Sequence, residues 1–335
     1  MKLRALLIAG GITLGVGAAA WAYFGGPTGR EVRVALRRGQ PLSAFADTLK
    51  AHRIIESPAL FLLFLRASGK EGYINAGYYV LRERDHEWRA ARKILAGPSA
   101  SLEVRVTIPE GMTIAQMAGL LSDSLGIDSA EFCSLARDAK FIDSLAKTYP
   151  YLKGLRSLEG FLFPDTYFFY KGEKPRALLL RMIERHFSFW TPERLSAAEE
   201  LRMTVGDVVI LASLVESETK LDEERPVVAS VFLNRLRRNM PLASNSALGY
   251  VLGKNPAWLS QEDLNTKSPY NTYRNPGLPP TPICNPGLKS IDAVLRPART
   301  DYLFFVATGE GNHLFSSTYE EHQRNVAKVR GSWNK

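Results

Sequence analysis

The first pattern along the chain is an unbroken uncharged stretch, Ala5–Phe24, rich in Leu, Ile, Val, Ala and Gly. Its length matches the roughly 20 residues that a helix needs to cross the hydrocarbon core of a bilayer. Lys2 and Arg4 precede the stretch, and Trp21, Tyr23 and Phe24 place aromatic rings at its far end, as at a membrane interface. We therefore expect residues 5–24 to form a transmembrane anchor, with residues 1–4 in the cytoplasm and everything after the anchor outside it.

A cleaved signal peptide is the alternative, because Ala18–Ala22 contains small residues at the spacing of a cleavage site. The apolar core of such a peptide is shorter, roughly 7–15 residues, so the length favours an uncleaved anchor. Residues 25–30 are expected to be a short linker. The sequence thus predicts a single-pass protein of the cytoplasmic (inner) membrane whose domains lie on the periplasmic or extracytoplasmic side.

A strand–turn–helix pattern occurs twice, seventy-two positions apart. Alternating apolar residues run through 32–36 and 104–108, each run is followed by a glycine at position 39 or 111, and a helical i, i+3, i+4, i+7 pattern comes next. Between the copies, Gly77–Leu81 predicts a strand and Trp88–Leu95 a short helix. Such β–α units resemble the LysM-like modules of wall-binding proteins. We assign residues 31–100 to a small LysM-like β/α subdomain, for which carbohydrate binding and plain α+β scaffolding fit equally well.

The remainder, residues 101–335, predicts a mixed α+β domain. Its 129–191 part is mainly helical, interrupted by the loop 158–167 and including a basic helix over 176–189. The whole chain of 335 residues has a formal net charge of +9, which favours an acidic partner. Outside the cytoplasm that partner is an anionic lipid or a carboxylate-bearing wall polymer, so we expect no nucleic acid.

Several kinds of chemistry are excluded by what the sequence lacks. The two cysteines, Cys133 and Cys284, are too few for a disulfide-rich scaffold or a multi-cysteine metal site, although they leave one bridge open. No pair among the five histidines has HExxH or a comparable metal-binding spacing, and P-loop, GxSxG and GxGxxG motifs are absent. We therefore expect no metal and no cofactor, and we interpret His313 and His322 as solvated surface residues.

A helix beginning with the Thr204–Asp207 capping box carries the candidate chemistry. Positions 208–215 are nearly all apolar, so the helix should be buried on most sides. At 100° per residue, Glu218 lies over a leucine and valine stripe, while Glu216 projects almost opposite. Loss of hydration above that stripe would raise the pKa of the Glu218 carboxyl, as a general acid requires. Two solvated acids at a helix end are the simpler interpretation of the same pattern.

The neighbouring segments resemble the lining of a sugar-binding groove. A second helix, 226–238, carries Asn234 on its polar side, and two loops follow: 269–273, which has two tyrosines and an asparagine, and 277–282, which has three prolines. Sugar rings stack on aromatic side chains, and amides bind their hydroxyl and acetamido groups. An ordinary proline-stiffened loop is the alternative.

Taken together, these motifs resemble the endolytic murein transglycosylases, the MltG or YceG-like family. The resemblance covers essentially the whole chain, and its motifs occur in the family's order. They are the segments 108–112, 159–167, 212–218, 228–236, 270–273, 277–280, 285–287, 302–306 and 313–316, with His322.

The resemblance implies a membrane-anchored lytic transglycosylase, a lyase that cuts nascent peptidoglycan strands internally. It implies a LysM-like subdomain followed by a catalytic domain over 101–335, and peptidoglycan synthases (penicillin-binding proteins) as membrane partners. The catalytic glutamate of the family falls on Glu218. It would protonate the oxygen between N-acetylmuramic acid and N-acetylglucosamine, then deprotonate the muramoyl C6 hydroxyl that attacks C1, leaving a 1,6-anhydro end. Expected substrate contacts come from six residues: Glu216 (or a structural role for it), Asn234, Asn245, Tyr270, Asn271 and Tyr273.

One segment departs from the family pattern. Residues 242–247 read Leu-Ala-Ser-Asn-Ser-Ala where the family usually has Leu-Gln-x-Asp-Pro-Thr, so Asn245 replaces an acid. A non-catalytic wall-binding or scaffold protein of the synthesis machinery is therefore one alternative function. A hydrolytic muramidase is another; it would need a second carboxylate, for which Asp165 and Glu159 are the candidates.

Overall fold

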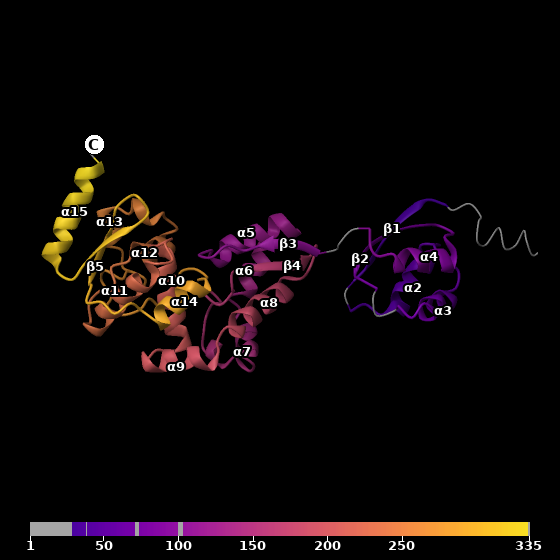
Figure 1. Cartoon of the computed structure of the whole chain (residues 1–335), viewed down its shortest axis with the longest axis horizontal. Coiled ribbons are helices and arrows are strands. Elements are labelled where there is room, and N and C mark those ends of the chain that lie inside the picture. Colours follow the sequence, from indigo (N-terminus) through magenta and orange to yellow (C-terminus); the bar gives the residue numbers. More distant parts are fainter. Residues whose placement is uncertain (1–28, 38, 71–73, 100–102, 334–335) are drawn as a thin grey trace, which may run out of the picture. The chain divides into compact units, whose positions relative to one another are not determined.

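The computed structural model describes residues 29–37, 39–70, 74–99 and 103–333. The predicted anchor and most of the predicted linker therefore lie outside the described residues. Within the described part, no helix combines the length and the apolar character that crossing a membrane requires. The chain divides into two compact units, 1–104 and 105–335, and both are built from helices with two-stranded sheets, which is a mixed α+β architecture (Figure 1).

The first unit is a two-stranded antiparallel sheet packed with three helices. Strands β1 (Glu31–Leu36) and β2 (Gly77–Arg82) pair in full register, with Glu31 opposite Arg82 and Leu36 opposite Gly77. The helices are α2 (Leu42–Ala51), α3 (Pro58–Ala67) and α4 (His86–Leu95). Their apolar faces meet the sheet in one buried core that includes Phe45, Leu49, Phe61, Leu65, Tyr79, Leu81 and Ile94. The predicted strands and the helix near residue 90 are confirmed, whereas α3 was not predicted because its sequence is apolar almost throughout.

The predicted repeat is confirmed as two strand–turn–helix units. The first copy is β1 with α2, and the second is β3 (Glu103–Thr107) with α5 (Ile114–Leu125). The turn glycines of the two copies, Gly39 and Gly111, have φ angles of 75° and 79°, a conformation that side-chain-bearing residues adopt only with strain. The strands nevertheless take different partners, since β1 pairs with β2 and β3 pairs with β4 (Thr166–Tyr170).

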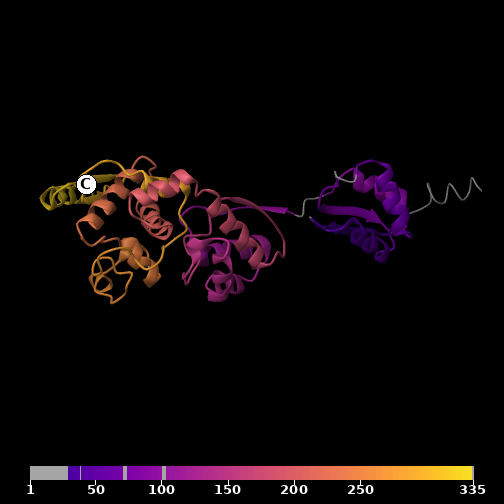
Figure 2. The same cartoon turned by 90° about the horizontal axis from the view of Figure 1, so that it is seen from below.

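The second unit continues with helices before and after β4. The helices before β4 are α6 (Ser129–Leu135) and α7 (Ala139–Ala146), and those after it are α8 (Pro175–Ser188), α9 (Pro192–Glu200), α10 (Val205–Glu218), α11 (Arg225–Arg237), α12 (Asn245–Leu252), α13 (Gln261–Leu264) and α14 (Leu288–Leu295). The chain ends with the antiparallel hairpin of β5 (Phe304–Ala307) and β6 (His313–Ser316), followed by α15 (Tyr319–Trp333). In both views α15 (yellow) lies at the end of this unit away from β4 (Figure 1, Figure 2).

Helix α10 is central to this unit, and α11, α12 and α14 surround it (Figure 1). The helix can be enclosed in this way because its apolar side chains cover more than one face. Val205, Val208, Val209, Leu211, Ala212, Leu214 and Val215 are all buried. The predicted capping box is present, with the Thr204 hydroxyl accepting from the Asp207 amide and the Asp207 carboxylate accepting from the Thr204 amide. The predicted burial of this helix is therefore confirmed.

A close backbone approach brings the 158–163 loop against α10. Gly160 has a φ of 87°, and a Cβ at this position would lie 2.4 Å from Pro282 Cγ and 2.8 Å from Val209 Cγ1. Only glycine permits both the conformation and the contact. The residue thereby joins α10 to two loops that are far apart in the chain.

We predict that Gly160→Ala lowers the free energy of unfolding by about 2–5 kcal/mol, because a left-handed conformation and an overpacked contact add together. Gly154 is the matched control, since it has a φ of 81° but no atom within 4 Å of the point that a Cβ would occupy. Gly154→Ala should cost only about 1–2 kcal/mol. Chemical denaturation of both variants measures the difference, and equal losses would contradict the packing argument.

Candidate active site

Glu218 is the last residue of α10, and its carboxylate faces the loop that leads into α12. Its Oε1 accepts a hydrogen bond of 2.6 Å from the Ser244 hydroxyl. Burial raises the pKa of Glu218, and although Ser244, Ser246, His313 and Arg235 all act in the opposite direction, burial is the largest influence. This is the direction that the helical position predicted, and a protonated carboxyl near neutral pH can act as a general acid.

Two of the predicted substrate residues lie beside this carboxyl. The Tyr273 hydroxyl donates to Asn245 Oδ1 at 2.6 Å; Asn245 is exposed, and 36% of the surface of Tyr273 is accessible. Burial and the charge of Glu218 raise the pKa of Tyr273, while Arg235 lowers it, so these groups share one electrostatic environment. Arg235 is fixed by its bonds to the Leu303 and Leu242 carbonyls, at 2.6 and 2.7 Å. The structure thus brings together Glu218, Asn245 and Tyr273.

The unusual 242–247 segment supplies partners that the sequence analysis did not identify. Ser244 bonds to Glu218 directly, and the hydroxyl of Ser246 also lowers the pKa of Glu218. Ser244 is itself held by Thr272, whose hydroxyl accepts from the Ser244 amide at 2.9 Å. Serines are too common in loops for their type alone to mark a site; only the fold shows that these two face the glutamate.

His313 is a second residue whose surroundings differ from the expectation. It was expected to be a solvated surface residue, but its side chain is only 7% exposed and its Nδ1 lies 2.6 Å from Glu224 Oε2. Its backbone amide also donates to Glu224 Oε1, at 2.8 Å. This correction follows from tertiary packing, because the β5–β6 hairpin carries His313 back to the start of α11.

Glu216 occupies an entirely different environment from Glu218. Its Oε1 lies 3.0 Å from Arg225 Nη1, and its Oε2 accepts from the Ser290 hydroxyl at 2.8 Å and the Gly287 amide at 3.0 Å. The side chains of Glu216 and Arg225 are each 7% exposed. This pair connects α10, α11 and α14, so its geometry supports the structural role rather than a substrate contact.

A cleft of about 850 Å³ lies next to the end of α10. Ser217 and Ser246 line it on the side of Glu218, and Tyr250 and Tyr270 contribute rings whose centroids are 5.6 Å apart. The Tyr270 hydroxyl is 2.7 Å from Thr281 Oγ1. Of the two loops predicted to line a sugar groove, only Tyr270 lines this cleft, and Glu218 and Tyr273 are not among its lining residues. Its paired aromatic rings and hydroxyl groups are nevertheless of the kind that sugars contact.

Glu159 also lines this cleft, but protein donors occupy both its oxygens. Oε1 accepts from the Ile114 amide at 3.0 Å and from Asn285 Nδ2 at 2.8 Å, and Oε2 accepts from the Tyr250 hydroxyl at 3.2 Å. Burial raises the pKa of Glu159 to about 7 in spite of these bonds. Asp165, the other candidate second acid, forms a 2.7 Å ion pair with Arg185.

Two predicted substrate residues are placed away from the groove surface. Asn271 is completely buried, and its amide nitrogen donates to the Leu264 and Thr266 carbonyls, so it holds its own loop together. Asn234 donates from Nδ2 to the carbonyls of Thr300 and Tyr302, at 2.9 and 3.0 Å. Both positions carry amides as expected, but the structure uses these amides to tie backbone segments.

Within the described part of the chain, no three His, Cys, Asp or Glu side chains gather as a metal ion would require. Cys133 and Cys284 are both free thiols. Cys284 is buried, and burial raises the pKa of its thiol to about 12, so it is not a nucleophile at neutral pH.

We predict that Glu216→Gln lowers the free energy of unfolding by about 3 kcal/mol, because it leaves the buried Arg225 without its main counter-charge. Glu223→Gln, an exposed neighbouring position, should change it by less than about 0.5 kcal/mol. Denaturant titration at neutral pH measures both. A Glu216→Gln variant as stable as the Glu223→Gln control would contradict the structural role of the ion pair.

At Glu218 we predict that replacing the glutamate raises the free energy of unfolding, and that the gain depends on pH. Because its folded-state pKa is raised, the folded protein holds this proton more tightly than the unfolded chain, and stability falls as pH rises above the ordinary glutamate pKa of 4.5. We expect Glu218→Gln to gain stability relative to the wild type as the pH rises from 4.5 through neutral. Parallel stability curves for the two proteins over that range would show that the carboxyl is not desolvated.

Comparison with known proteins places this geometry in a family. Residues 34–328 match the model of the YceG-like family. A Bacillus subtilis (strain 168) protein named endolytic murein transglycosylase is 30% identical over 311 residues, which cover 90% of this chain and 86% of that protein. A Streptococcus pneumoniae (strain D39) protein of the same name is also 30% identical, and the match covers 89% of this chain but 58% of that longer relative. The crystal structure of a YceG-like protein from Listeria monocytogenes aligns with a TM-score of 0.62 and 29% identity, over 88% of this chain and 98% of that one.

Proposed function

This chain belongs to the YceG-like family, and from that premise we propose that it is a peptidoglycan lytic transglycosylase with Glu218 as its single acid and base. The observation that carries the proposal is the state of this carboxyl. It is half-buried at the end of α10 and burial raises its pKa, it is bonded to the Ser244 hydroxyl, and among the described residues no lysine, arginine or histidine forms an ion pair with it. The curated relatives are named endolytic murein transglycosylase.

The proposed reaction needs only one carboxyl group. Protonated Glu218 donates its proton to the glycosidic oxygen as the bond from C1 of N-acetylmuramic acid to that oxygen breaks, and N-acetylglucosamine leaves with a free 4-hydroxyl. The Glu218 carboxylate then takes the proton of the muramoyl C6 hydroxyl as O6 bonds to C1. The product ends in a 1,6-anhydro ring, no water is consumed, and Glu218 is protonated again.

The contacts of the other acids support this mechanism over hydrolysis. A muramidase would need a second free carboxylate to activate water or to form a covalent intermediate. Glu159 accepts three hydrogen bonds from protein donors, Asp165 pairs with Arg185, and Glu216 pairs with Arg225. Each of these carboxylates is therefore engaged by donors or a cation of the protein itself.

The scaffold alternative depends on the unusual 242–247 segment. Ser244 and Ser246 both interact with Glu218, and Asn245 bonds to Tyr273, so the altered residues still make contacts at the glutamate. We therefore favour an active enzyme. Tyr270 and Tyr273 are the proposed stacking and hydroxyl contacts for the sugar rings.

The proposed location follows from the sequence. Residues 5–24 would anchor the protein in the cytoplasmic membrane, and the unit over 31–100 would act as a LysM-like module that orients glycan. Peptidoglycan synthases in the same membrane would supply nascent strands. The net charge of +9 suits a substrate whose peptide stems are anionic.

Mass spectrometry of the muropeptides that the full-length protein releases from purified sacculi tests the proposed reaction. We expect products lighter by one water than the corresponding reducing sugars. Glu218→Gln should reduce their rate of formation by about 100-fold or more, since general acid–base catalysis contributes roughly 10²–10⁴-fold. Glu223→Gln serves as the charge-matched control and should leave the rate unchanged.

The other outcomes separate the alternatives. Reducing ends without the anhydro ring would identify a muramidase and require a second carboxylate. An absence of products, with sacculus binding retained by the wild type and by Glu218→Gln, would leave the scaffold function.

A further inference from the structure

A second cleft, of about 930 Å³, lies on the far side of α11 from Glu218. Residues of α11 at helical spacing form one wall: Ser230, Leu233, Asn234 and Arg237. Arg235, which contacts the Glu218 side, projects from a different face of the same helix. The cleft and the candidate active site therefore flank one helix within the second unit.

The opposite wall is the segment that follows α14, and it is held in place by α11. Asn234 bonds to the Thr300 and Tyr302 carbonyls, and the Ser230 and Thr300 hydroxyls are 2.7 Å apart. The Ala298 amide donates to the Pro226 carbonyl at 3.0 Å. The Asn234 amide, which the sequence predicted as a sugar contact, thus shapes this cleft instead.

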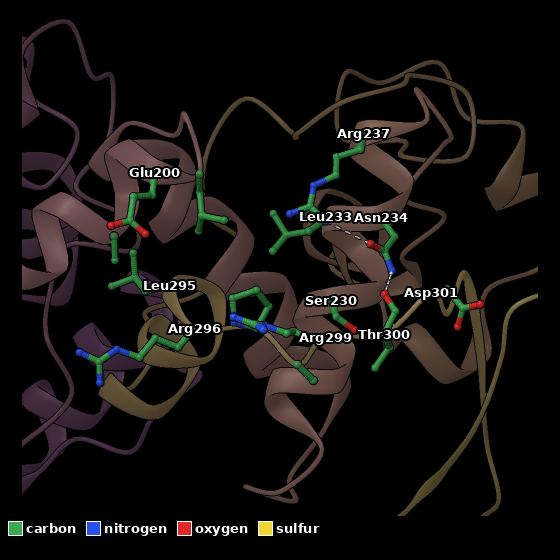
Figure 3. A pocket seen from close by; sticks show the side chains of 14 residues that line it. Glu200, Ser230, Leu233, Asn234, Arg237, Leu295, Arg296, Arg299, Thr300 and Asp301 are labelled. Carbon is green, nitrogen blue, oxygen red and sulfur yellow. Dashed lines mark hydrogen bonds between the residues drawn. The ribbon is translucent and has the colours of Figure 1, made fainter.

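Two arginines reach into the cleft from these two walls. Figure 3 shows Arg237 on the α11 wall and Arg299 on the opposite wall, whereas Arg296 points away from both. Arg237 has one long hydrogen bond, of 3.3 Å, to Asn234 Oδ1. Among the residues that the structure describes, no carboxylate pairs with Arg237 or Arg299. Two such guanidinium groups lining one cleft are suited to bind carboxylates through paired hydrogen bonds.

The rest of the lining indicates which anion fits. Leu201, Leu233 and Leu295 provide apolar walls, and Glu200 and Asp301 lie on either side of the arginines in the view of Figure 3. Carboxylates at these positions disfavour a polyanion, because they would repel its neighbouring charges. A short aliphatic peptide that carries carboxylates and a free amine complements the two arginines, the leucine walls and the two acids of this cleft.

We propose that this cleft binds the stem peptide of peptidoglycan, with Arg237 and Arg299 taking its carboxylates. The inference rests on the proposed function for its substrate class and adds to it a site for the peptide, separate from the groove for the sugars. Because of this second site, strands that carry stem peptides are better substrates than strands from which the peptides have been removed.

Binding of a soluble muramoyl pentapeptide to the full-length protein in detergent, measured by isothermal titration calorimetry, tests this site. The ligand has no glycosidic bond to cleave, so its binding does not depend on catalysis. We expect Arg237→Gln/Arg299→Gln to weaken binding at least about 10-fold, as the loss of charge-assisted hydrogen bonds implies. Arg156→Gln/Arg324→Gln removes the same charge from exposed positions elsewhere and should stay within about 2-fold of the wild type.

A second titration uses the wild type alone, so it tests the site even if the double variant does not fold. A peptide with amidated carboxylates should bind at least about 10-fold more weakly than the free acid. Equal binding of the two peptides, or of the wild type and a folded Arg237→Gln/Arg299→Gln, would overturn the proposal. So would complete competition by inorganic phosphate at the concentration of the peptide, because that would indicate a site for any small anion. Peptide binding without any cleavage of sacculi would instead refute the proposed reaction and leave this site standing.

Discussion

A carboxyl group removed from water has to be paired or protonated, and the packing around α10 meets this requirement in two different ways. Helix α10 ends with two glutamates in a buried setting, and the fold treats them differently. Glu216 receives Arg225 and two hydrogen-bond donors, so it is stable as an anion. Glu218 receives a hydroxyl from Ser244 and no ion-pair partner among the described residues, so burial raises its pKa. One helix therefore provides a structural anion and a proton donor two residues apart.

Segments that are far apart in the chain pack around α10 and maintain the different environments of Glu216 and Glu218. Asn285 is completely buried and bonds to Met112 and to Glu159 and Leu162 of the 158–163 loop, two segments that are far apart in the chain. The close approach at Gly160 brings the same region against the helix. These contacts hold Glu159 away from any role as a free second acid, and this supports a mechanism in which the substrate's own hydroxyl replaces water.

The two clefts of the second unit divide the proposed substrate by its chemistry. The cleft near Ser217 and Ser246 presents aromatic rings and hydroxyl groups, as sugars require, whereas the cleft around Arg237 and Arg299 presents cations, apolar walls and two acids. Peptidoglycan combines both kinds of group in each repeating unit. A protein that contacts both can recognise the strand as it is synthesised, before its peptides are removed.

The local elements and the catalytic candidate follow from residues that are neighbours in the chain. Periodicity identified the strand–turn–helix repeat, the capped buried helix and the desolvated face of Glu218, because all of these depend on residues close together in the chain. Tertiary structure alone decided which polar residues serve the site. It brought Ser244 and His313 toward Glu218, and it buried Asn271 and turned Asn234 to the far side of α11. Those outcomes depend on contacts between residues tens of positions apart, for which residue type and spacing carry no signal.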